Sequence, residues 1–273
     1  MTLALHGVGY RYAGATRPSL LDVDLVLPHG EVVGLVGASE AGKTTLCLVA
    51  SGLAPRAIGG QIRGRVTLDD EDVDAWPMHR LSQRIGIGFQ NPANQLSQVT
   101  ESVFEEVAFG PMNLGLPRDE VLERTWSAVD ALRIGPLVER DPRRLSGGQQ
   151  QLVAIAGLLA LGPDHLVLDE PTAQLDPAGT RLVADAIARL ATGGASILVA
   201  EHKTDLLLDV AARVIAVDAG WIVLDGPAAE VLADPAIEVL GVAPPAAVRL
   251  TREAERGGVP AAARARLAEA LAK

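Results

Sequence analysis

The fold is decided by the stretch Gly37-Ala38-Ser39-Glu40-Ala41-Gly42-Lys43-Thr44-Thr45, which follows the apolar run 32–36. Its pattern is glycine, four residues and Gly-Lys-Thr, placed between a strand-like segment and a helix-like one. Glycine lets the backbone curl until successive N–H groups face an anion, and a helix start adds a partial positive charge. The stretch therefore predicts a phosphate-binding loop that opens a helix over 44–51. The alternative is an ordinary glycine-rich turn between strand and helix.

Three residues of this loop bear on its chemistry. Lys43 is expected to reach the β and γ phosphates of a nucleotide, and Thr44 is expected to hold Mg²⁺. Glu40 is unusual, because it brings a carboxylate next to the phosphates. We expect its side chain to point away from the nucleotide, so that only its backbone N–H lies near the phosphates.

The composition predicts a stable globular protein with a sizeable core. The chain has 273 residues, 48 % of them hydrophobic, and a formal net charge of -10. That charge gives no overall attraction to nucleic acid or to an anionic membrane surface. The longest apolar run, 152–161, is too short to span a bilayer, and residues 1–3 lack the features of a secretory signal. We therefore expect a cytoplasmic protein that has no nucleic-acid partner.

Polar side chains follow three further strand-like segments. These are Gln90, the adjacent pair Asp169 and Glu170, and His202. Because neighbouring side chains at a strand end point in different directions, the two carboxylates can have different roles. Asp169 suits the metal, directly or through water, and Glu170 suits polarising the attacking water. His202 has two interpretations, a sensor of the γ phosphate or a surface histidine that caps the next helix.

A second glycine pair precedes another predicted helix. The segment is Leu145-Ser146-Gly147-Gly148-Gln149, and the helix is expected over 150–161. A helix start of this kind can bind an anion through its free N–H groups. The sequence therefore contains two candidate anion sites, far apart along the chain.

Two tyrosines, Tyr10 and Tyr12, lie close together ahead of the phosphate loop. They are notable because only 3 % of the chain is aromatic. One ring could stack on a nucleotide base, which offers apolar and π contact. The alternative is a pair of half-buried strand tyrosines without a ligand.

The pattern of residue types divides the chain. Residues 1–36 consist of short strand-like runs separated by turns, and 97–144 show helical periodicity. The segment 241–273 is rich in proline, alanine and arginine and contains a predicted helix over 260–271. We expect one domain over 1–240, with a helical insertion at about 97–144, and a helical C-terminal extension.

Three acids lie near the start of the helical insertion. They are Glu101, Glu105 and Glu106. A solvated helix face is the default explanation for such a group, and docking on a basic partner is the alternative.

Taken together, residues 1–240 resemble the ATP-binding cassette (ABC) ATPases. The motifs that occur in that family's order are the phosphate loop, Gln90, 145–149, 169–170, 173–176 and His202. The resemblance implies an α/β fold, with a P-loop NTPase core on a mixed parallel sheet. It also implies an N-terminal antiparallel β subdomain and a helical insertion subdomain.

The resemblance further implies roles for individual residues. Gln90 would contact Mg²⁺ and the attacking water, and Tyr12 would stack on adenine. The segment 146–148 would bind the γ phosphate of ATP held by the opposite subunit, so that two cassettes enclose two nucleotides head to tail. Leu152 and Glu40 depart from the family's usual pattern, but neither change removes a residue assigned to catalysis.

Within that family, the chain resembles the ATPases of energy-coupling factor importers. The similar segments are 89–92 with Gln95, 105–110, 113–116, 172–177 and 201–203. Those importers take up vitamins or cobalt and nickel ions. The resemblance implies a place at the cytoplasmic face of the membrane, beside a transmembrane coupling subunit and a substrate-binding membrane protein. It also implies a second ABC ATPase subunit, identical or similar to this chain.

The residues and the resemblance together predict hydrolysis of MgATP by in-line attack of water on the γ phosphate. Glu170 is the predicted base, and His202 and Gln90 position the γ phosphate and the water. Lys43 stabilises the charge that develops. The alternative function is a soluble ABC-type ATPase that acts as a clamp or assembly factor. The sequence disfavours it, because it shows no long coiled coil, no second cassette and no basic stripe.

Overall fold

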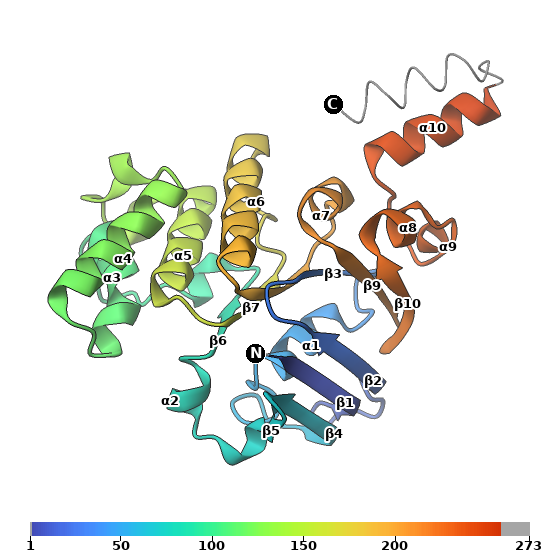
Figure 1. The fold of residues 1–273 in the computed structure, drawn as a ribbon, viewed down its shortest axis with the longest axis horizontal. Helices are drawn as coiled ribbons and strands as arrows, with labels where there is room; N and C mark the ends of the chain where they lie inside the picture. The colour runs from blue at the N-terminus through green and yellow to red at the C-terminus, as the bar shows by residue number, and fades with distance from the viewer. Residues whose placement is uncertain (1, 258–273) are drawn as a thin grey trace.

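The computed structural model describes residues 2–257, and its framework is a six-stranded sheet (Figure 1). The strands are β3 (Val32–Val36), β6 (Ile85–Gly88), β7 (His165–Asp169), β8 (Ser196–Ala200), β9 (Arg213–Asp218) and β10 (Trp221–Pro227). Their order is β10-β9-β3-β8-β7-β6, and all neighbours are parallel except β10, which runs antiparallel to β9. Every residue of β3, β7 and β8 is buried, which explains why these strands are nearly continuous apolar runs.

A second, antiparallel sheet has the order β2-β1-β4-β5. Its strands are β1 (Leu3–Arg11), β2 (Leu20–Leu27), β4 (Gln61–Leu68) and β5 (Glu71–Asp72). Helix α1 (Lys43–Ala50) contacts β1 of this sheet and β7 and β8 of the other. All its residues except Thr44 are buried. The helix that begins at the phosphate loop is therefore part of the core between the two sheets.

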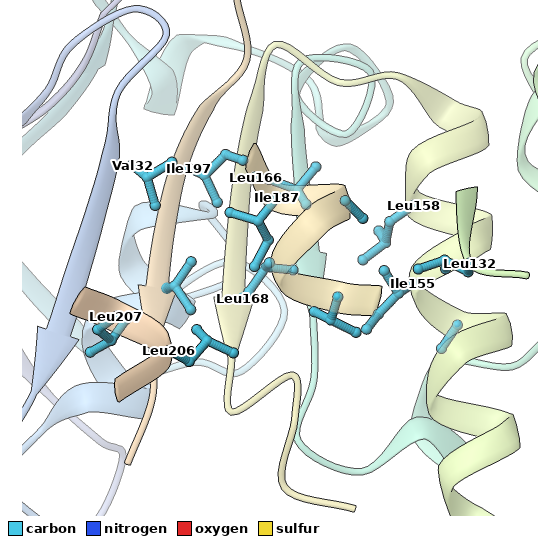
Figure 2. Packing of buried hydrophobic residues seen from close by; sticks show 14 of the residues in the cluster. Val32, Leu132, Ile155, Leu158, Leu166, Leu168, Ile187, Ile197, Leu206 and Leu207 are labelled. Carbon is cyan, nitrogen blue, oxygen red and sulfur yellow. The ribbon is translucent and has the colours of Figure 1, made fainter. Parts of the chain in front are cut away.

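Helices cover the other face of the six-stranded sheet. They are α5 (Gly147–Leu161), α6 (Pro177–Thr192) and α7 (Thr204–Val210). Figure 2 shows how Leu166 and Leu168 of β7 lie among Ile155, Leu158 and Ile187 of these helices. This second apolar cluster fixes α5 and α6 against the strand that ends in Asp169.

A helical group lies to one side of the sheets (Figure 1). It consists of α3 (Val103–Asn113) and α4 (Arg118–Ala131), which contact each other and α5. The remaining α-helices are α2 (Met78–Leu81), α8 (Ala228–Ala233), α9 (Ala236–Val239) and α10 (Ala246–Arg256). Within residues 2–257, none of the helices has both the length and the apolar character needed to cross a bilayer.

The architecture confirms the expected α/β class, with a largely parallel sheet and an antiparallel N-terminal sheet. Helix α5 begins three residues before the expected start, because Ser146 caps it. Helix α7 follows His202, where a next helix is expected, and α10 lies within the expected helical extension over 241–273, but the sequence pattern gives bounds for neither. Helix α7 has only seven residues, and α10 has none that is buried, so neither leaves a clear apolar signal. The helix expected over 260–271 lies outside the described residues.

The expectation of a solvated acidic face is wrong for Glu106. Its side chain is buried and accepts hydrogen bonds from the backbone N–H and hydroxyl of Ser97 and from the hydroxyl of Thr100. Glu105 instead forms a capping box with Ser102 at the start of α3. Periodicity could not show this, because the partners of Glu106 come from the loop before the helix.

Candidate functional site: the carboxyl edge of the parallel sheet

Many of the predicted site residues lie at the carboxyl ends of neighbouring parallel strands. The phosphate loop (Gly37–Thr45) follows β3, and Asp169 ends β7. Gln90 comes two residues after β6, and His202 comes two residues after β8. Since β3, β8, β7 and β6 are consecutive and parallel, these ends meet at one edge of the sheet. The fold therefore gathers four distant segments of the chain at one place.

The phosphate loop has a backbone that favours glycine at two positions. Gly37 and Gly42 have φ values of 156° and 117°. A Cβ on Gly37 would lie 2.3 Å from the carbonyl oxygen of Val217, and a Cβ on Gly42 would lie 2.8 Å from that of Ser19. The loop is thus packed closely on neighbouring backbone, which holds its own N–H groups in the curled arrangement that suits a phosphate.

The side chain of Lys43 folds back onto the start of the phosphate loop. Its ammonium donates hydrogen bonds to the carbonyl oxygens of Gly37 and Ala38, each at 2.9 Å. Burial lowers the pKa of Lys43, and the nearby carboxylates of Glu170 and Asp169 oppose that effect. A buried cation at the phosphate loop, close to two acids, can bind a polyanion.

Glu170 stands at the centre of the polar contacts at this edge. Its Oε2 accepts a hydrogen bond from Nε2 of Gln90 at 2.7 Å, and its Oε1 lies 3.0 Å from Nε2 of His202. The residue has a φ of 51°, in the left-handed region, and its N–H donates to the carbonyl of Ala200 on β8. Lys203, not His202, occupies the N-cap position of α7. His202 is therefore not the N-cap residue of α7, and its role at the γ phosphate stays a prediction.

Asp169 and Thr44 offer oxygen atoms to a hard cation. Asp169 is 5 % exposed, and its Oδ1 is buried without a hydrogen-bond partner among the described residues. Burial raises the pKa of Asp169, against a hydrogen bond from the exposed Thr44 that lowers it. The described residues contain no group of three His, Cys, Asp or Glu side chains that could hold a metal by themselves. This donor set fits Mg²⁺, which takes few protein ligands and completes its shell with waters and phosphate oxygens.

The two tyrosines have different surroundings. Tyr10 is buried, and its hydroxyl donates to the carbonyl of Gly59. Tyr12 is half-buried, and its hydroxyl lies 3.1 Å from Oγ1 of Thr45 in α1. The two rings meet edge to face, with their centroids 5.0 Å apart. Tyr12 reaches the phosphate-loop helix through this contact, and stacking of adenine on it stays a prediction.

The middle of the phosphate loop faces solvent. Ser39 and Glu40 are exposed, whereas Ala41 is buried and its N–H donates to the carbonyl of Ala38. Glu40 has a φ of 65°, a left-handed conformation that glycine adopts more readily than glutamate. The direction of its carboxylate relative to a nucleotide stays a prediction.

The signature segment (Leu145–Gln149) caps its own helix. The hydroxyl of Ser146 accepts from the N–H of Gln149 at 3.4 Å, and Oε1 of Gln149 accepts from the N–H of Ser146 at 3.1 Å. Gly147 and Gly148 lie against Gln174, whose Oε1 would be 2.2 Å from a Cβ on Gly147. None of these contacts joins the signature segment to the phosphate loop of the same chain.

Several residues that shape the site carry no signal for that role in the sequence. Gln95 accepts from the N–H of Phe89 at 3.2 Å and donates to the carbonyl of Ala154 in α5 at 3.1 Å, so it fixes the segment ahead of Gln90 on that helix. Glu201 and Lys203 make comparable links to the segment after Glu170. These partners are brought together only by the fold, which is why spacing along the chain does not show them.

Comparisons with known proteins agree with this geometry. The family model described as ABC transporter matches residues 20–173. A putative ABC transporter ATP-binding protein of Pyrococcus abyssi is 37% identical over 259 residues, which cover 94% of this chain and 92% of that protein. The energy-coupling factor transporter ATP-binding protein EcfA of Methanosarcina acetivorans is 36% identical over 258 residues, with 94% and 91% covered.

Solved structures show the same fold. The structure of cbiO1 from Clostridium perfringens, described as part of the ABC transporter complex cbiONQ, has 32% identity and a TM-score of 0.74, and the match covers 86% of this chain and 92% of that one. The dimeric cassette MJ0796 bound to ADP and Pi has a TM-score of 0.73 at 24% identity, which shows the fold alone. With the phosphate loop, the paired carboxylates and these matches in agreement, the chain belongs to the ABC transporter family, as an ATPase of the ATP-binding cassette type.

Proposed function

We propose that this chain is the ATP-hydrolysing subunit of an importer of the energy-coupling factor type. The observation that carries the catalytic part is Glu170, held between Gln90 and His202 beside the phosphate loop. The importer part is supported by the similarity to EcfA proteins and to cbiO1. The cargo class we infer is a vitamin or a transition-metal ion, and the place of action is the cytoplasmic face of the membrane.

The proposed chemistry needs a base, a positive charge and an oriented water. Glu170 accepts the proton of the water that attacks the γ phosphate, and Gln90 and His202 hold that carboxylate and the water in line. Lys43 stabilises the charge on the transferring group. Mg²⁺, when bound through Thr44, Asp169 and Gln90, would neutralise charge on the phosphate oxygens.

The site becomes complete in a dimer. In our proposal the exposed Ser146, with Gly147, Gly148 and Gln149, contacts the γ phosphate on the phosphate loop of a second subunit. A second copy of this chain is the simplest such partner, because it brings a full set of motifs in a two-fold arrangement. The self-capped and glycine-rich start of α5 leaves N–H groups free for an anion.

The membrane partners are inferred from the same relatives. We propose that the helical group of α3 and α4 contacts a transmembrane coupling subunit, which in turn carries a small substrate-binding membrane protein. Co-purification of the full chain from its native membranes tests this. Recovery with integral membrane proteins supports the importer, whereas recovery only in a soluble complex on DNA or on an assembly scaffold would contradict it.

The catalytic part is tested by Glu170→Gln. The amide keeps the size and hydrogen-bonding reach of the side chain but cannot accept the proton, so we expect kcat to fall about 10²–10⁴-fold while ATP still binds. Glu101→Gln, an exposed acid outside the site, is the matched control and should keep the parental rate. ATP turnover of Glu170→Gln at the parental rate would show that Glu170 is not the base.

A further inference from the structure

A buried carboxylate next to His202 gathers three hydrogen bonds. Glu201 is 2 % exposed, and its Oε2 accepts from the hydroxyl of Thr172 at 2.6 Å. Its Oε1 accepts from the N–H groups of His202 and Lys203, at 2.8 and 3.2 Å. One side chain therefore fixes the backbone at His202 and, through Thr172, the segment that follows Glu170.

Lys203 also binds the segment that follows Glu170. The ammonium of Lys203 donates to the carbonyl oxygens of Thr172 at 2.9 Å and Leu175 at 3.3 Å, and to Oγ1 of Thr180 at 2.9 Å. These three acceptors use the full donor capacity of an ammonium. Thr172 is thus held twice, by its hydroxyl and by its carbonyl.

The segment so held has little structure of its own. Ala173, Gln174 and Asp176 are exposed, and the backbone bonds within the turn are those from Ala173 to Glu170 and from Leu175 to Thr172. Leu175 packs on the apolar cluster, and the carboxylate of Asp176 accepts from the N–H of Gly179 in α6. These contacts hold the far end of the turn, and the carboxylate of Glu201 and the ammonium of Lys203 hold the end next to Glu170 from the segment that carries His202.

The start and the tip of this turn lie at functional positions. It begins at Glu170, the proposed base, and at its tip Gln174 lies against Gly147 and Gly148 of the signature segment. A shift of the turn would therefore move the base and the neighbours of the signature glycines together. Displacements of about 1 Å at a reacting group can cost about 100-fold in rate.

From this geometry we infer that Glu201, Lys203 and Thr172 form a clamp of positioning residues. The clamp fixes Glu170 relative to His202 in one site, and Gln174 beside the signature segment that serves the other site of the dimer. This inference rests on the proposed function, because it assigns the clamp to the hydrolysis step rather than to nucleotide binding. The hydrogen bonds that form the clamp do not include the phosphate loop.

The test is a kinetic comparison of Lys203→Met, Thr172→Val and Thr172→Ser. Methionine keeps the length of the side chain but removes the donors, and valine removes only the hydroxyl. We expect both to lower kcat about 10- to 100-fold, with the KM for ATP and the affinity for a fluorescent ATP analogue within about threefold of the parent. Thr172→Ser retains the hydroxyl and should keep kcat within about threefold.

Arg181→Met is the matched control, because it removes an exposed cation from α6, one residue after Thr180. It should leave kcat at the parental value. The inference is overturned if Lys203→Met turns over ATP at the parental rate. It is also overturned if kcat and nucleotide affinity fall together, as a general loss of structure would cause, or if Thr172→Ser is as impaired as Thr172→Val.

Glu170→Gln, measured in parallel, separates the two claims. If Glu170→Gln loses turnover while Lys203→Met keeps it, the clamp fails and the proposed function stands. If Glu170→Gln keeps turnover, the catalytic part of the proposed function fails, because Glu170 is then not the base.

Discussion

Two helix starts in this chain are rich in glycine, and they are built in opposite ways. The phosphate loop ahead of α1 has Gly37 and Gly42 pressed against backbone carbonyls, and a buried Lys43 bonded across it. In the signature segment at the start of α5, Gly147 lies against the flexible side chain of Gln174, and a Cβ on Gly148 would lie at a looser 3.1 Å from the carbonyl oxygen of Gln174. Its Ser146 caps the helix. The first is packed into the core, and the second lies near the surface.

The difference indicates which site needs a partner. The phosphate loop has its cation, its curled backbone and its carboxylates within one chain. The signature segment starts a helix, whose first N–H groups have no partner within the helix backbone. The side-chain hydrogen bonds between Ser146 and Gln149 bring it no cation or acid. An anion held there needs further ligands. A site shared between two subunits supplies them, which is why we place the signature segment of one subunit over the phosphate loop of another.

The largest contrast should appear when alanine replaces one glycine in each place. Gly42→Ala puts a Cβ against Ser19 backbone at a positive φ, so we expect it to lower the free energy of unfolding by about 1–3 kcal/mol and to weaken ATP binding. Gly147→Ala meets only the end of a flexible glutamine, so it should cost less than about 1 kcal/mol. It should nevertheless lower ATP hydrolysis by about tenfold or more.

Urea unfolding and steady-state ATPase assays measure both effects. A Gly147→Ala variant with parental hydrolysis would break the comparison, because the signature segment would then have no part in the reaction. A Gly42→Ala variant as stable as the parent would show that the phosphate loop is not held by its packing.

The buried carboxyl group of Asp169, beside the phosphate loop, predicts a pH effect on stability that the signature segment lacks. Because burial raises the pKa of Asp169, the folded nucleotide-free protein binds a proton there more tightly than the unfolded chain does. The contribution of Asp169 to the free energy of unfolding is therefore most favourable at low pH, and it is lost as the pH rises through the raised pKa. Asp169→Asn should stabilise the nucleotide-free protein at pH 7 and lower its hydrolysis.

The stability gain of Asp169→Asn should shrink as pH falls, because Asp169 itself becomes protonated. Urea midpoints at pH 7 and at pH 4 give the two values. An Asn variant that is less stable than the parent at pH 7 would contradict the raised pKa.

The smallest effect is expected at Glu40, a residue of the phosphate loop that is not glycine although its backbone conformation is left-handed. Its φ of 65° suits glycine, so Glu40→Gly should raise the free energy of unfolding by about 0.5–1 kcal/mol, after the entropy that glycine adds to the unfolded chain. Since the side chain is exposed, ATP affinity should change by less than about threefold. A large gain in affinity, measured by titration, would show that the carboxylate repels the nucleotide.

The parts of the site that could be predicted from the sequence are those that depend on residues close together in the chain. The phosphate loop, the paired carboxylates after an apolar run and the glycine pair before α5 each depend on neighbouring residues, and their positions along the sheet follow from the order of parallel strands. The ring contact of Tyr12 and the contact between His202 and Glu170 needed the three-dimensional structure. Their partners are set by packing between elements.

The misses have a common physical cause. Glu106 has the spacing of a surface acid, yet the loop before α3 folds back and supplies its three donors. Thr172 and Glu201 are separated by 29 residues and meet only because β7 and β8 are neighbours. Such pairings depend on the tertiary fold, and no periodicity in the sequence records them.

The central claim, that each nucleotide site is shared between two subunits, is tested most directly by mixing two inactive variants. Lys43→Ala removes the phosphate-loop cation, and Ser146→Arg blocks the signature segment. In a mixed dimer, one site combines both defects and the other combines an intact phosphate loop with an intact signature segment. Since half of the dimers are mixed, each with one of two sites intact, we predict about a quarter of the parental ATPase activity. A mixture no more active than either variant alone would contradict the shared site.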